Sequence, residues 1–108
     1  MLDVNFEFAC GILFVRLEGR INRDSVLSIE NNLRDIIKKG GIKYLVFNVD
    51  KTIIEERVDL FDECNLLIKN NKGVMYICGL KNKIESVVSS GCGIINNELA
   101  ALNKIRVC

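Results

Sequence analysis

The stretch Tyr44-Leu45-Val46-Phe47-Asn48-Val49-Asp50 decides the fold of this chain. It follows Gly40-Gly41, is rich in apolar and β-favouring residues, and is short enough to be a central strand buried on both faces. The sequence then predicts a charged loop from Asp50 to Arg57 and an amphipathic helix from about Val58 to Lys69. In an open α/β sheet, partners and ligands are met where a strand's carboxyl end turns into a helix. The search for function therefore starts at this loop.

The other elements follow from patterns on either side of this stretch. Apolar and polar residues alternate from 2 to 18 around Cys10-Gly11, which predicts a β-hairpin. Helical spacing of apolar residues from Val26 to Ile37 predicts a helix, with Asn22 or Asp24 as its N-cap. Further along, we expect a strand at 74–80, a short helix around 84–88, a brief strand at 94–95 and a terminal helix capped by Asn97.

Strands that alternate with helices imply parallel neighbours joined by right-handed crossovers, and the hairpin adds an antiparallel pair. We therefore predict an α/β fold with a small mixed sheet of about four or five strands and about four helices. The chain has 108 residues, of which 49% are hydrophobic, and this suits one ordinary core. We expect a single domain that covers residues 1–108.

Charge and hydropathy narrow the classes of partner. The 15 basic and 14 acidic residues are scattered and give a net charge of +1, which argues against a nucleic-acid partner. The longest apolar run, Ile12 to Val15, is far shorter than the roughly 20 residues that span a bilayer. The first residues also lack the pattern of a signal peptide. We expect a cytoplasmic protein without membrane insertion.

The residue types that carry catalysis and metal binding are scarce. The chain has no His, and its five cysteines are widely spaced without a Cys-x-x-Cys pair, so neither a metal site nor an activated thiol is expected. Cys64 and Cys78 are interpreted as small buried apolar groups and Cys108 as an exposed terminal thiol, with redox sensing as the alternative. Glycine-rich nucleotide-binding motifs are missing as well. We predict a protein that is not an enzyme and needs no cofactor.

Two runs of sequence carry a resemblance to a known family. The first is Leu13-Phe14-Val15-Arg16-Leu17-Glu18-Gly19-Arg20-Ile21-Asn22, and the second is the Tyr44 to Asp50 stretch after the Gly-Gly pair. With Gly73 to Cys78 and Leu99 to Leu102, they make nearly the whole chain resemble the STAS domain (sulfate transporter and anti-sigma factor antagonist). The small cytoplasmic members that antagonise anti-sigma factors are the most similar. The resemblance implies a protein-interaction module whose partner is an anti-sigma factor of the serine kinase type.

The chain departs from the family at one motif. In the family, a serine of an Asp-Ser-Ser-Gly motif at the start of the second helix is phosphorylated by the anti-sigma kinase, which switches binding off. Here Ile54 replaces the Asp, and Glu55-Glu56-Arg57 replaces Ser-Ser-Gly. Ser89-Ser90-Gly91 repeats part of the motif, but it falls at the end of a predicted helix, where Gly91 is interpreted as a C-cap residue. No phosphorylation site is expected.

Glu55 and Glu56 have two interpretations. Acidic residues are favoured in the first turn of a helix, where they complement the macrodipole by about 0.3–1 kcal/mol. Alternatively, Glu56 supplies a permanent negative charge where a phosphoserine would stand, with one charge against the roughly 1.5 to 2 of a phosphate. The second interpretation predicts a module that is locked in one binding state.

The candidate partner-binding residues surround the loop. Asn22 reads as a helix cap and Asn48 as a strand-end turn former, and both are expected on the same edge of the sheet as the loop. The full set is Asn22, Asn48, Asp50, Thr52, Glu55, Glu56, Arg57 and Asp59. We predict that the loop 50–59 and the helix after it sequester an anti-sigma factor.

Three other functions stay open at this point: a cytoplasmic STAS subunit of a lipid transporter, a stress-signalling scaffold and a small-ligand sensor. The sequence also leaves the oligomeric state open, a homodimer included.

Overall fold

The computed structural model describes residues 2–80 and 93–105 of the chain. In chain order the elements are β1 (Leu2–Ala9), β2 (Ile12–Ile21), α1 (Arg23–Gly40), β3 (Tyr44–Ile54), α2 (Leu60–Asn70), β4 (Val74–Cys78), β5 (Gly93–Ile95) and α3 (Glu98–Ile105). The strands form one sheet in the order β1-β2-β3-β4-β5. Within this described part of the chain, the β1–β2 pair is antiparallel and the other three pairs of neighbouring strands are parallel. The predicted mixed sheet is thereby confirmed.

The N-terminal hairpin closes over a two-residue turn. Cys10 and Gly11 both have positive φ, 55° and 75°, as a type I′ turn requires, and Ala9 pairs with Ile12 directly behind them. The pairing then runs without a register shift to Leu2 opposite Gly19. β2 continues to Ile21, beyond the predicted end of the hairpin at 18, because its second half pairs with β3 on its other side.

Helix α1 has strong signals at both ends. Asn22 is its N-cap: the side-chain oxygen accepts from the backbone N–H of Ser25 at 2.8 Å, and the Ser25 hydroxyl oxygen accepts from the Asn22 N–H at 3.0 Å. This reciprocal pair is a capping box. At the other end Gly41 adopts the left-handed conformation, with φ of 59°. Of the two predicted N-caps, the structure selects Asn22.

Strand β3 is longer than the sequence predicted. Residues 50–54, which were expected to begin a loop, are the second half of β3, and only residues 55–59 connect it to α2. The register shifts where β2 advances from Arg16 to Glu18 while β3 advances from Asn48 to Lys51, so β3 carries an extra residue. Such a β-bulge breaks the alternation that marks a strand in sequence. The same correction moves the start of α2 from Val58 to Leu60.

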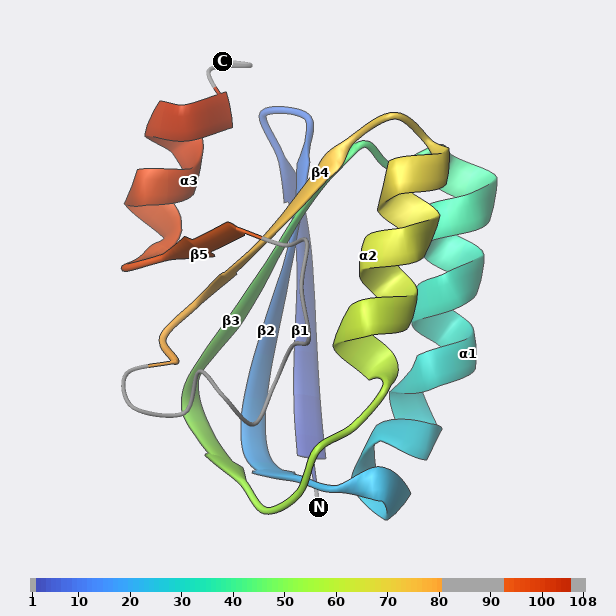
Figure 1. The fold of residues 1–108 in the computed structure, drawn as a ribbon, viewed down its shortest axis with the longest axis vertical. Helices are drawn as coiled ribbons and strands as arrows, with labels where there is room; N and C mark the ends of the chain where they lie inside the picture. The colour runs from blue at the N-terminus through green and yellow to red at the C-terminus, as the bar shows by residue number, and fades with distance from the viewer. Residues whose placement is uncertain (1, 81–92, 106–108) are drawn as a thin grey trace.

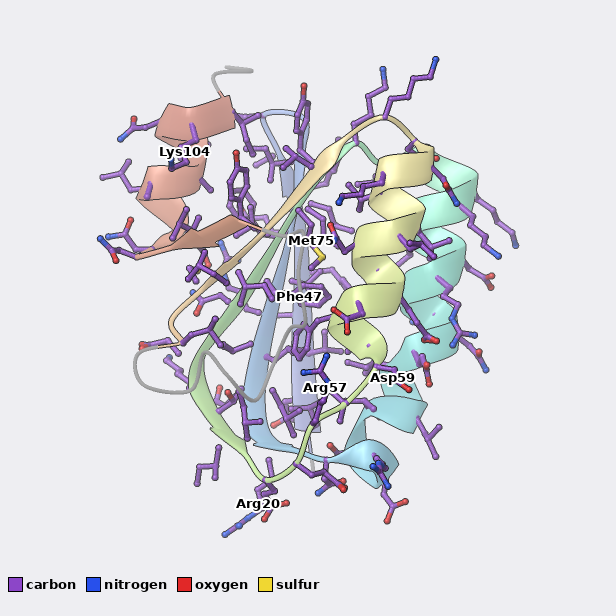
Figure 2. The ribbon with its side chains drawn as sticks, viewed as in Figure 1. Arg20, Phe47, Arg57, Asp59, Met75 and Lys104 are labelled. Atoms are coloured by element: carbon purple, nitrogen blue, oxygen red, sulfur yellow. The ribbon has the colours of Figure 1, made fainter. Side chains whose placement is uncertain are left out.

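The sheet has helices on both faces, α1 and α2 on one and α3 on the other (Figure 1). The larger core lies beneath α1 and α2, where the rings of Phe47 and Phe61 meet edge to face with centroids 4.9 Å apart. In Figure 2, Phe47 and Met75 lie between the strands and α2. A smaller core beneath α3 contains Phe14 and Ala101. β3 serves both cores, which confirms that it is buried on both faces.

Cys64 and Cys78 are buried, as predicted, and burial raises the pKa of their thiols to about 12 and about 11. Such thiols stay protonated and act as small apolar groups. The terminal helix is confirmed, with the Asn97 side chain accepting from the backbone N–H of Ala100 at 2.9 Å. Three predictions lie outside the described residues: the helix around 84–88, the Ser89-Ser90-Gly91 assignment and the Cys108 thiol.

Candidate functional site

The connection between β3 and α2 is clamped onto the start of α1. Parallel pairing aligns Ile21 with Ile54, so the residues that follow each strand, Asn22 and Glu55, lie side by side. Glu55 accepts from the Asn22 side-chain amide at 2.8 Å and from Arg20 at 2.7 Å, and its backbone N–H donates to the Ile21 carbonyl. These hydrogen bonds from Asn22 and Arg20 lower the pKa of the Glu55 carboxyl group below its ordinary value. Glu55 is therefore held as a carboxylate.

Glu56 caps α1 from outside that helix. Its carboxylate accepts from the backbone N–H of Arg23, the first residue of α1, at 2.9 Å and lies 3.7 Å from the Arg23 guanidinium. The interpretation that Glu55 and Glu56 occupy the first turn of the second helix is thus wrong in place, because α2 starts at Leu60. Its physical reason still applies, since the carboxylate complements the amino-terminal dipole of α1 instead.

Apolar and charged side chains are exposed together beside these hydrogen bonds of Glu55 and Glu56. Ile53 is 58% exposed at the end of β3, and Leu27 is 64% exposed on α1, on the helix stripe that Arg23 also occupies. Arg57 is tied to the first turn of α2 by an ion pair with Asp62 at 3.0 Å. Figure 2 shows Arg20 at the lower end of the view and Arg57 and Asp59 above it, beside the start of α2. We call this surface, made by Arg20, Asn22, Arg23, Leu27, Ile53, Glu55, Glu56, Arg57 and Asp59, the clamp surface.

Three of the predicted site residues, Thr52, Asn48 and Asp50, do not belong to the clamp surface. Thr52 is only 5% exposed, and its hydroxyl donates to the Val49 carbonyl at 2.6 Å, so it is a core residue. Asn48 lies on the α3 face of the sheet, where its amide donates to Glu98 at 2.8 Å and its oxygen accepts from the Asp50 N–H. The expectation that Asn48 shares an edge with the loop is therefore wrong: the six further residues of β3 carry the chain away from it.

Asp50 lies on the same face as Asn48, beside a groove of about 300 Å³. The groove crosses three strands and is lined by Asp3, Val4 and Asn5 of β1, by Arg16, Leu17 and Glu18 of β2, and by Asn48, Asp50 and Lys51 of β3. Asp50 is exposed, but it opens onto this groove and not onto the clamp surface. The predicted site residues thus fall in three places: Thr52 in the core, Asn48 and Asp50 at the groove, and the others at the clamp surface. Those others are Asn22, Glu55, Glu56, Arg57 and Asp59.

An ion-pair network that the sequence analysis missed holds α3 on the sheet. Arg16 donates to both carboxylate oxygens of Glu98, each at 2.8 Å, and a third nitrogen lies 2.6 Å from Glu7. Arg16 lowers the pKa of Glu98, mainly by hydrogen bonding. These partners are far apart in sequence, so no local pattern could have paired them; only an Arg in the middle of an apolar strand was a signal.

A second missed cluster joins the two helices of the other face. Arg34 of α1 donates to Glu30 at 2.6 Å and to Glu63 of α2 at 2.9 Å. Glu30 is the more enclosed carboxyl group, and the neighbouring Glu63 raises its pKa above the ordinary value. The three side chains fix α1 beside α2 and so help to fix the clamp surface.

Within the described ranges 2–80 and 93–105, no three His, Cys, Asp or Glu side chains gather as metal ligands would. In the same ranges, no helix combines the length and the hydrophobicity that crossing a membrane needs.

Comparison with known proteins adds to this geometry. No family model matches the sequence. The anti-sigma factor antagonist SpoIIAA in its unphosphorylated form superimposes with a TM-score of 0.74 at 15% identity, over 96% of this chain and 98% of that one. A Moorella thermoacetica RsbS variant with a glutamate in place of a serine gives 0.75 at 17%, over 95% and 94%. The STAS domain of an antisigma-factor antagonist from Rhodobacter sphaeroides gives 0.60 at 18%, over 82% and 97%.

The chain therefore has the STAS fold, and the similarity extends over nearly its whole length. The resemblance found in the sequence is confirmed at the level of the fold.

Proposed function

We propose that this protein is a non-catalytic, cytoplasmic protein-interaction module that acts as an anti-sigma factor antagonist and binds an anti-sigma factor of the serine kinase type. The fold supports this role, because two of the solved structures that share it over nearly their whole length are named as anti-sigma factor antagonists. The clamp surface is the proposed docking site. It replaces the loop 50–59 of the sequence prediction.

The observation that carries the proposal is the set of hydrogen bonds that holds the clamp surface together. Glu55 and Glu56 attach the β3–α2 connection to the end of β2 and the start of α1 through three side-chain hydrogen bonds, to Arg20, Asn22 and the Arg23 N–H. A surface that is ordered before binding loses less conformational entropy on association. The exposed Ile53 and Leu27 supply apolar contact area beside charged groups, which is the composition of a transient protein interface.

The same site is proposed to lack a phosphorylation switch. Residues 44–70 contain no Ser, and the only hydroxyl side chain apart from Tyr44 is that of Thr52, which is buried and already hydrogen-bonded. In SpoIIAA an unphosphorylated form is distinguished, and in the RsbS variant a glutamate stands where the natural protein has a serine. We propose that Glu56 supplies a permanent charge here, which keeps the module in one binding state.

Co-purification from the native host tests the partner. A tagged wild-type chain should recover a serine-kinase anti-sigma factor, and the double variant Ile53→Asp and Arg57→Glu should not, because it changes the apolar and the charged part of the clamp surface together. Asp35→Asn, an exposed change on the far part of α1, is the matched control. Recovery of membrane transporter subunits without a kinase would contradict the proposal and favour the transporter alternative.

Affinity measurements with that kinase test the permanent charge. Glu56→Gln keeps an oxygen for the Arg23 N–H and removes only the charge, whereas Glu56→Ser removes both. If the charge sets the binding state, both variants change the dissociation constant, by about tenfold for a change of 1.4 kcal/mol. An affinity unchanged in Glu56→Gln and in Glu56→Ser would rule out the locked state while leaving the docking proposal intact.

A further inference from the structure

The outer edge of β1 is an open strand edge. Among the residues that the structure describes, β1 is the end strand of the sheet, eight residues long, and pairs only with β2 (Figure 1). The two-residue turn makes Ala9 and Ile12 a hydrogen-bonded pair, and hydrogen-bonded and non-hydrogen-bonded pairs alternate along the hairpin from there. The backbone N–H and C=O groups of every second residue of β1 therefore point outward, away from β2: those of Leu2, Val4, Phe6 and Phe8. Among the described residues, none donates to these outward groups or accepts from them.

This edge has little of the usual protection against an added strand. Natural edge strands carry charged side chains, Pro, bulges or short length, whereas β1 has only the charges of Asp3 and Glu7, has neither Lys nor Pro, and keeps an unbroken register over all eight residues. Its outward-pointing backbone belongs to residues with apolar side chains, and Phe8 at the end of this row is 62% exposed. An added strand would therefore gain backbone hydrogen bonds and apolar contacts together.

The opposite row of β1 determines the charge of the occupant. Asp3, Asn5 and Glu7 are exposed and lie on the face that carries the groove, whose wall also includes Glu18 and Asp50. The basic residues in the lining of this groove are Lys51 and Arg16, and Arg16 already forms ion pairs with Glu7 and Glu98. The face beside the edge is consequently acidic.

We propose that β1 accepts an extended partner segment that alternates apolar with basic residues and adds to the sheet as a sixth strand. Its apolar side chains continue the row of Val4, Phe6 and Phe8. Its basic side chains reach Asp3 and the acidic groove. A second copy fits less well, because full antiparallel pairing of two β1 strands places Asp3 opposite Glu7, and like charges opposite each other are destabilising. This surface is separate from the clamp surface, so the two proposals stand or fall independently.

Short peptides test the proposal with the intact chain. The probe is a peptide of about eight residues that alternates Val with Lys, and the matched control alternates Val with Glu. We expect the Val/Lys peptide to bind at least about tenfold more tightly in a calorimetric or anisotropy titration. It should also protect the amides of Val4, Phe6 and Phe8 from hydrogen exchange. Equal binding of the two peptides, or protection elsewhere, would overturn the proposal.

Two variants separate the edge from its charge. Val4→Pro removes one outward N–H and leaves the hairpin's own hydrogen bonds, because a proline fits an edge strand whose N–H faces solvent. It should abolish peptide binding while circular dichroism stays unchanged. If this variant does not fold, Asp3→Lys at an exposed position still decides, because it should weaken the Val/Lys peptide and favour the Val/Glu peptide. A dimer of the free wild-type chain that Val4→Pro dissociates would assign the edge to a second copy and contradict the proposal.

Discussion

Asn22 joins two parts of the molecule with one side chain. Its oxygen caps α1 through the Ser25 N–H, and its amide nitrogen donates to Glu55. Asn22→Ala should therefore lower the free energy of unfolding by about 1 kcal/mol, the usual effect of losing an N-cap. Asn22→Asp keeps the capping oxygen but places a second carboxylate against Glu55, so it should lie between wild type and Asn22→Ala. Urea unfolding measures both, and an Asn22→Ala variant as stable as wild type would show that this cap is dispensable.

Glu98 should make stability depend on pH. Hydrogen bonds from Arg16, and then from Asn48, lower its pKa in the folded state, so its contribution is fully present above the unfolded pKa of about 4.3 and is lost as the pH falls through the folded value. Glu98→Gln should cost about 1–2 kcal/mol at neutral pH. The difference between the two proteins should shrink as the pH falls from the unfolded pKa of about 4.3 through the lowered folded pKa, below which the wild-type carboxyl group is also neutral. A difference in unfolding free energy that stays constant with pH would contradict this role.

Among the helices and strands, the sequence predicted best those features that depend on interactions between residues close together in the chain. The capping box at Asn22, the Gly41 C-cap and the two-residue turn at Cys10-Gly11 all depend on neighbouring residues, and all were predictable. The extent of β3 was not, because a bulge near Asp50 shifts which side chains are buried, and it arises from pairing with a strand about thirty residues earlier. The true contacts of Glu55 and Glu56 depend on the same long-range pairing.

At Gly73, between α2 and β4, the backbone lies so close to the backbone of Lys43 that there is no room for a side chain. A Cβ added there would clash with the carbonyl group of Lys43, which also accepts from the Val74 N–H. Gly73→Ala should therefore force the two strand starts apart and cost about 3 kcal/mol. Gly41→Ala is the matched control: the site has a positive φ of 59° but open space around it, so only conformational strain of about 1 kcal/mol is expected. Similar losses in thermal or urea unfolding would show that the close approach at Gly73 can relax.

At the scale of the whole molecule, the two faces of the sheet differ in strength. The face beneath α1 and α2 holds the larger core, with Phe47 and Phe61 at its centre, while the face beneath α3 combines a smaller core with the Arg16–Glu98 network. Periodicity in the sequence predicted the first face, since its helices are long and amphipathic. It could not show that α3 is attached through charges, because Arg16 and Glu98 are 82 positions apart.

This asymmetry predicts that α3 opens before the rest of the protein unfolds. Its eight residues bury little apolar surface, so their amides should exchange through a local opening of lower free energy than global unfolding. Glu98→Ala removes the attachment to Arg16 and should increase exchange in α3 while leaving β3 and α1 unchanged. Lys104→Ala, an exposed change in the last turn of the same helix, controls for altered helix propensity. Hydrogen exchange followed by mass spectrometry resolves these segments. Equal acceleration in α3, β3 and α1 would mean that the molecule opens as one cooperative unit.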